Sequence, residues 1–179
     1  LPGSDRSFAN SSGTLGCYIM DHAMRTFFWG TVPEGQLDQY VEYGRRPTGV
    51  YIPKFRNLNG QDADADFVRG YGMQGAAGRG PAGAGGFGKA MKEAMRGYGP
   101  WTIRFTAFAE CLPYKDNTIT LNPAKLDRYG VPRAVFNVTF RDNEMKMMRD
   151  AALQGEAMMK AAGLTGMTTS NEEHVPGDA

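Results

Sequence analysis

Three glycines, Gly83, Gly85 and Gly88, have the spacing of a GxGxxG motif directly before a predicted helix, and Glu110 lies 22 residues after Gly88. A dinucleotide site of this kind needs a buried strand that leads into the first glycine, so that the helix N-terminus points at the pyrophosphate. The preceding residues, Gly-Arg-Gly-Pro-Ala at 78–82, are not such a strand. A P-loop also fails, because Ala90 occupies the place of the Ser or Thr that binds magnesium.

Nucleic-acid binding is a second interpretation of the same glycine-rich stretch, which runs from Gly70 to Gly88. Arg-Gly-Tyr-Gly at 69–72 and Gly-Arg-Gly at 78–80 resemble RGG-type segments that stack on bases. Only three arginines fall between Arg69 and Arg96, and the whole chain has a net charge of +1. We therefore expect a solvated loop and no nucleic-acid partner, and keep nucleotide or nucleic-acid binding as an alternative.

The histidines and cysteines form no local catalytic or metal-binding pattern. His22 and His174 have no partner at a recognisable spacing, and Cys17 and Cys111 lack CxxC spacing. We therefore predict no metal site and two buried free thiols. Nothing local supports a Ser-His-Asp or Cys-His site, whose members meet only in space.

One strand predicted over residues 101–111 carries the best candidates for a binding pocket. Alternation places Thr106, Phe108 and Glu110 on one face, where a hydroxyl, a ring and a carboxylate could project together. Asn137 and Thr139, on a strand expected beside it, are added as weaker candidates. An ordinary solvent-facing strand remains the alternative.

The elements that must position these residues follow from periodicity and turn residues. The pattern predicts a helix at 87–96 with Phe87, Met91 and Met95 in the core, and a longer helix capped by Asp142, with Glu144 in its first turn. Residues 101–111 and 118–121 are expected to form a hairpin. Strands are predicted at residues 25–32, 49–55, 66–72, 101–111, 118–121 and 134–140. The predicted fold is α+β, a mainly antiparallel sheet of about six strands with helices packed on one face.

Three segments resemble the glucose-methanol-choline (GMC) oxidoreductase family, in particular its bacterial branch of gluconate- and sorbose-type dehydrogenases. Leu-Gly-Cys-Tyr-Ile-Met-Asp-His at 15–22 is similar to a G-R-x-L-x-D-H segment at the end of the flavin domain. The stretch at 108–121, with Leu-Pro followed by Asp-Asn-Thr-Ile-Thr-Leu, is similar to a strand-turn-strand of that family. Residues 127–132 and Asn143-Glu144 resemble its D-x-x-G-x-P and N-E motifs.

The resemblance implies a substrate-side domain that roofs the flavin of an FAD-dependent enzyme oxidising an alcohol, sugar or polyol. Asp21 and His22 would then lie near the flavin, and Thr106, Phe108 and Glu110 would line the pocket. The implied division is a junction with the flavin domain at 1–22, the substrate domain at 23–167 and a linker at 168–179. The domain's partner would be the rest of its own chain. The resemblance also implies that no catalytic residue lies in this chain, and we expect these 179 residues alone to bind no FAD and to be inactive.

A free-standing α+β ligand-binding module is the alternative function. In either case, no run of residues reaches the 18 to 20 apolar positions of a membrane span, and we expect a soluble protein of the bacterial cytoplasm or periplasm.

Overall fold

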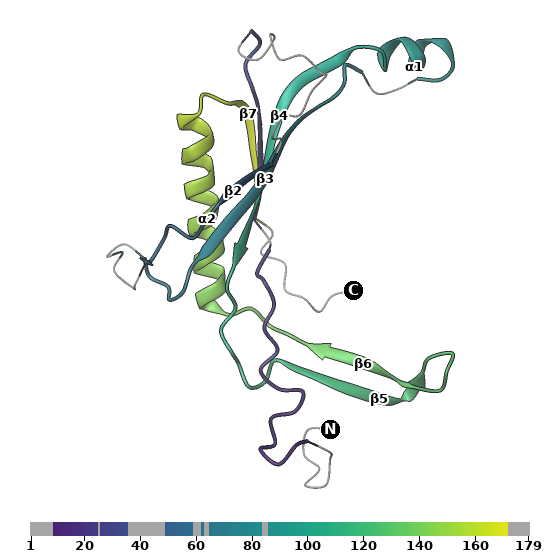
Figure 1. Cartoon of the computed structure of the whole chain (residues 1–179), viewed down its shortest axis with the longest axis vertical. Helices are drawn as coiled ribbons and strands as arrows, with labels where there is room; N and C mark the ends of the chain where they lie inside the picture. Colours follow the sequence, from purple (N-terminus) through teal and green to yellow (C-terminus); the bar gives the residue numbers. More distant parts are fainter. Residues whose placement is uncertain are drawn as a thin grey trace.

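The centre of the molecule is a five-stranded antiparallel sheet with the strand order β2-β3-β4-β1-β7 (Figure 1). The computed structural model describes residues 9–24, 26–35, 49–58, 62, 65–83 and 86–171. The sheet strands are β1 (Thr26–Thr31), β2 (Gly49–Ile52), β3 (Tyr71–Pro81), β4 (Tyr98–Ala109) and β7 (Thr165–Asn171). The other elements are α1 (Lys89–Ala94), α2 (Asp142–Ala161) and a separate hairpin of β5 (Thr118–Leu126) and β6 (Pro132–Asn137). The predicted α+β class is confirmed.

Helix α2 covers one face of the sheet and forms the core with it. Met147, Met148 and Met159 are buried on the helix. The sheet contributes Phe28 and Met73, which are also fully buried. A side chain at Gly155 would come within 2.6 Å of the Phe28 ring, so this glycine sets how closely α2 approaches β1.

The prediction of a loop over Gly70–Gly88 was wrong for most of its length, because residues 71–81 form β3. Pairing with β4 along nearly all of β3 satisfies backbone hydrogen bonds and compensates for the low strand propensity of glycine. Gly75 lies opposite Phe105, and a Cβ there would be 2.5 Å from the Phe105 ring. The missing side chain makes room for that ring, which stacks on Phe28 at 5.5 Å between centroids.

The expected hairpin between residues 101–111 and 118–121 was also wrong, since β5 pairs with β6 and not with β4. The turn that reverses the chain comes later, where the Asp127 carboxylate accepts hydrogen bonds from the backbone N–H groups of Tyr129 and Val131. The β5–β6 hairpin therefore projects away from the main sheet as an arm (Figure 1).

Helix α1, residues 66–70 and β7 also differ from the sequence prediction. Helix α1 does not pack on the sheet: it lies at the far end of the β3–β4 arm and buries none of its residues (Figure 1). Residues 66–70 are not in a strand. β7, which the sequence analysis missed, pairs with β1, so the boundary expected at residue 168 falls inside a strand. Residues 1–8 of the expected junction and 172–179 of the expected linker, with His174, lie outside the described residues.

Candidate functional site

The sheet face opposite α2, hereafter the open face, carries most of the predicted pocket residues. Directly paired residues in neighbouring strands share a face. Thr106 lies between Gln74 and Phe27, and the next row of the open face places Arg104 beside Trp29. Thr106 and Phe108 are two residues apart on β4 and therefore share the open face. Glu110 follows directly after the end of β4 at Ala109.

A shallow hollow of about 640 Å³ lies on this face, along the paired strands β1 and β4. The side chains of Phe27 and Trp29 are 41% and 40% exposed there. The Arg104 guanidinium and the Thr106 hydroxyl border the same hollow. Two aromatic rings with a cation and a hydroxyl beside them form a surface that can bind a flat, partly polar molecule.

A smaller hollow of about 260 Å³ lies beyond the end of β4 and brings together the predicted Asp21, His22 and Glu110. The His22 ring meets the Phe108 ring edge-on, with centroids 5.7 Å apart. Asp21 accepts a hydrogen bond from the backbone N–H of His22 at 2.7 Å, and Glu110 forms an ion pair with Lys54 at 3.4 Å. Residues from both predicted groups thus meet at one end of the open face.

Asn137 and Thr139 do not lie on a strand beside β4, so that part of the prediction was wrong. Asn137 ends β6 in the separate hairpin, and Thr139 follows it. The Asn137 amide donates to the carbonyl of Asp116, and the backbone N–H of Thr139 donates to the side chain of Asn117. Both contacts fix the base of the hairpin.

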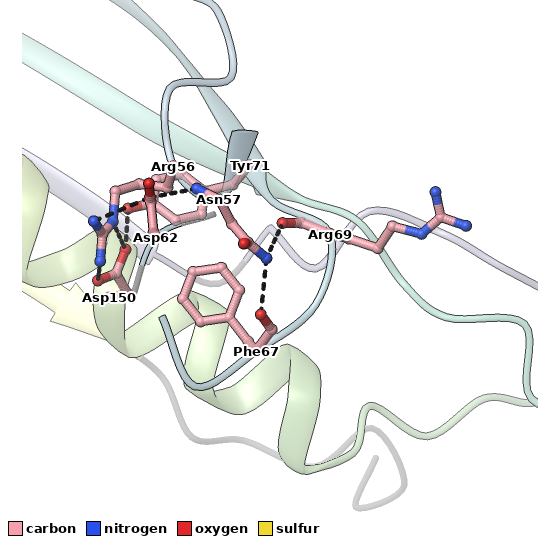
Figure 2. Close-up of polar contacts among 7 residues, drawn as sticks. All are labelled: Arg56, Asn57, Asp62, Phe67, Arg69, Tyr71 and Asp150. Carbon is pink, nitrogen blue, oxygen red and sulfur yellow. Dashed lines mark hydrogen bonds and ion pairs between the residues drawn. The ribbon is translucent and has the colours of Figure 1, made fainter. Parts of the chain in front are cut away.

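The largest polar network lies on the helix side of the sheet and holds a loop against α2 (Figure 2). Arg56 binds Asp150 through two hydrogen bonds of 2.9 Å, and also contacts Asp62 at 3.2 Å. The Tyr71 hydroxyl donates to Asp150 at 2.5 Å. Burial, and then the neighbouring Asp150 carboxylate, raise the pKa of Tyr71. With its charges paired, this network is structural.

A second buried group, Glu144, ties the end of β4 to the start of α2. Its carboxylate accepts from the backbone N–H of Leu112 at 2.9 Å, from that of Arg141 at 2.8 Å and from the Tyr114 hydroxyl. The helix cap is therefore Arg141 and not the predicted Asp142, which forms an ion pair with Lys146. Burial, and then the charge of Glu144, raise the pKa of Tyr114 to about 12.

The glycine motif has no phosphate-binding geometry among the described residues. β3 and β4 are antiparallel neighbours and α1 has six residues, whereas a dinucleotide site needs a parallel βαβ unit. Ala84 and Gly85 lie outside the described residues.

The predictions about metal ligands and cysteines concern the same described part of the chain. It contains no group of three or more His, Cys, Asp or Glu side chains that could hold a metal ion. Cys17 and Cys111 are free but half-buried rather than buried. Burial, and then Glu144, raise the pKa of the Cys111 thiol. None of the helices described has the length and apolar character needed to cross a bilayer.

Comparison with known proteins gives one distant relationship. No protein-family model matches the chain. It is 26% identical over 187 aligned positions to a 2-methyl-1,2-propanediol dehydrogenase of Mycolicibacterium austroafricanum. The alignment covers 97% of this chain but 31% of that dehydrogenase, so the chain spans about a third of the length of its relative. The chain is thus distantly similar to part of an oxidoreductase.

Sequence reasoning missed Phe27 and Trp29 as members of the open face. Alternation puts Arg104 on that face, but it was not predicted as a pocket residue. The signal was present for Arg104, which alternates in step with Thr106 along β4. The sequence around Phe27 and Trp29 shows no such alternation, because Phe28 between them is equally aromatic and faces the core. Only the pairing of β1 with β4 decides which rings lie beside Arg104.

Proposed function

We propose that this chain is the substrate-side domain of an FAD-dependent oxidoreductase of the GMC type, which oxidises an alcohol, sugar or polyol. The similarity of nearly the whole chain to part of a diol dehydrogenase supports this proposal. The resemblance of residues 15–22 and 108–121 to GMC segments supports it independently. In this proposal, the open face is the roof of the substrate pocket.

The single observation that carries the proposal is the contrast between the two faces of the sheet. Helix α2 buries one face, while the other keeps Phe27 and Trp29 exposed beside Arg104 and Thr106. Their chemistry fits a flavin and a small alcohol, because a flat aromatic ring system packs on exposed rings and alcohol oxygens accept from a guanidinium or a hydroxyl.

The flavin, when bound, would supply the redox chemistry by accepting a hydride from the alcohol carbon. The residues of this chain would orient and enclose the substrate. Phe27 and Trp29 would exclude water from one side of it, and Thr106 and Arg104 would hold its oxygens. Asp21 and His22 would lie toward the flavin at the other end of the face. We assign no catalytic base in this chain.

The test uses the complete protein that contains this segment, purified and examined by flavin absorbance and by alcohol-dependent reduction of that absorbance. Thr106→Val and Arg104→Met each remove a hydrogen-bond donor from the open face. We expect kcat/KM to fall about tenfold in each, with unchanged flavin content. Thr120→Val and Arg133→Met, on the β5–β6 hairpin, are matched controls that should keep full activity.

Two results would contradict the proposal. The first is a complete protein without flavin; binding of a small molecule by the isolated chain would then support the free-standing module. The second is tight, stoichiometric FAD binding by these 179 residues alone. Equal losses of activity in the controls would show that the open face has no special part in the reaction.

A further inference from the structure

The far end of the β3–β4 arm, described over residues 82, 83 and 86–98, is mostly exposed to solvent. We call it the arm tip. It contains α1 and the turns on either side, and it lies well away from the sheet and from α2 (Figure 1). From Gly86 to Tyr98, every residue is exposed except Ala94, which is half-buried. The tip therefore adds nothing to the core.

Three large apolar side chains follow one another along the tip: Met91 lies in α1 and Met95 is its C-cap, while Phe87 comes before the helix, ahead of Gly88 with its non-helical φ of 70°. Phe87, Met91 and Met95 are four residues apart and are 96%, 41% and 54% exposed. Tyr98 at the base of the tip is 55% exposed. Large apolar side chains gathered in this way are usually buried against a neighbouring element, and the described residues supply none for Phe87, Met91 and Met95.

Charge is concentrated at the same end of the molecule. Residues 79–101 contain four basic residues, Arg79, Lys89, Lys92 and Arg96, and one acidic residue, Glu93. The other 156 residues contain sixteen basic and eighteen acidic residues. The arm end is thus positive on a molecule that is otherwise slightly negative. Lys89 is 90% exposed and its only ion pair among the described residues is with Glu93, at 3.7 Å.

We propose that the arm tip binds an anionic lipid surface, with Phe87, Met91 and Met95 entering the headgroup region and the basic residues contacting lipid phosphates. An amphipathic segment of this kind binds by apolar burial plus attraction to anionic lipid, and its lysine stems can lie along the apolar boundary. An acidic protein is the competing partner. A stable protein interface takes roughly 800 Å² from each partner, and the one helix of the tip has six residues.

Co-sedimentation with lipid vesicles tests this proposal on the chain as it is. Vesicles of neutral phosphatidylcholine are compared with vesicles that also contain about 30% phosphatidylglycerol, and we expect at least about tenfold stronger partitioning to the anionic ones. High salt should weaken this partitioning, because it screens the attraction of the basic residues.

The variants separate the tip from other exposed apolar groups. The triple variant Phe87→Ser, Met91→Ser, Met95→Ser should lose binding, and Lys89→Glu with Lys92→Glu should lose the preference for anionic vesicles. The matched control replaces Leu126, Tyr129 and Val131 with Ser at the end of the other arm, where they are 50%, 73% and 54% exposed.

The control should bind vesicles like the unchanged chain, and circular dichroism should show that all variants are folded. Three results overturn the proposal: no preference of the unchanged chain for anionic vesicles, full binding by the tip variants, or equal loss in the control. Vesicle binding is independent of the proposed oxidoreductase function, so neither result decides the other.

Discussion

Replacement of the buried Glu144 is the sharpest test of how this domain is held together. Its two oxygens accept from the backbone N–H groups of Leu112 and Arg141 and from the Tyr114 hydroxyl, so one side chain joins β4, the start of the hairpin and α2. In Glu144→Gln, one oxygen becomes an NH₂ group. Whichever way the amide is turned, its buried NH₂ group faces a backbone N–H, so that two donors meet where an acceptor stood.

The cost can be estimated from these contacts. An unsatisfied buried donor costs about 1–3 kcal/mol, and the remaining hydrogen bonds lose the help of the charge. We expect Glu144→Gln to lower the free energy of unfolding by about 2–3 kcal/mol and the melting temperature by about 4–12 °C for a domain of this size. Glu144→Ala removes all the acceptors and leaves a cavity, so its loss should be larger.

The assay is thermal and urea unfolding followed by circular dichroism. The matched control is Glu156→Gln, because Glu156 lies on the same helix but is exposed. Its effect should stay within about 0.5 kcal/mol. A change below about 1 kcal/mol in both Glu144 variants would refute the view that this carboxylate joins the three elements.

Three further predictions concern packing, pH and ion pairing. Gly75→Ala should destabilise the chain by about 1–3 kcal/mol in urea unfolding, because its methyl group would meet the Arg104 carbonyl oxygen at 2.4 Å. Gly78→Ala on the same strand, with nothing within 4 Å, should be neutral or mildly stabilising. Tyr114 has its pKa raised from 10.0 to about 12 in the folded chain, so its contribution to stability is complete below pH 10.0 and is lost as the pH rises through about 12. The difference in urea midpoint between the unchanged chain and Tyr114→Phe should therefore shrink over that range, and a constant difference would contradict the assignment. Arg56→Met should lower the free energy of unfolding by about 3–5 kcal/mol, because it leaves the Asp150 carboxylate, 16% exposed, without its cation. An unchanged melting temperature would show that the network in Figure 2 is dispensable.

The parts of the fold that the sequence predicted are those set by local periodicity. The alternation of β4 identifies the strand and its buried face, and the longer predicted helix corresponds to α2. Strand pairing is different, because it depends on residues far apart in the chain. β3 is a strand because β4 lies beside it, and its glycines and alanines alone favour a loop.

The same distinction applies to the candidate site. Alternation was sufficient to place Thr106 and Phe108 on one face of β4, and Glu110 lies just beyond the end of that strand. The contact of His22 with Phe108 joins segments far apart in the sequence, and only the resemblance had suggested a role for that histidine. Asn137 and Thr139 were misplaced because the sequence does not reveal that β6 leaves the main sheet.

The exposure of the open face separates the two functional interpretations in energetic terms. With about 40% of Phe27 and of Trp29 exposed, and roughly 200 Å² of surface per aromatic side chain, each ring leaves about 80 Å² in contact with water, which is worth about 2 kcal/mol if it were buried. A free-standing module would gain that energy only from its ligand. A roof domain gains it from the flavin side of the pocket, even without substrate. In the complete protein, substitution of either ring by Ala should therefore weaken the attachment of this domain to the rest of the chain. It should also raise the KM for the alcohol. If the KM alone changes, the rings contact only the substrate and the open face is not an interface.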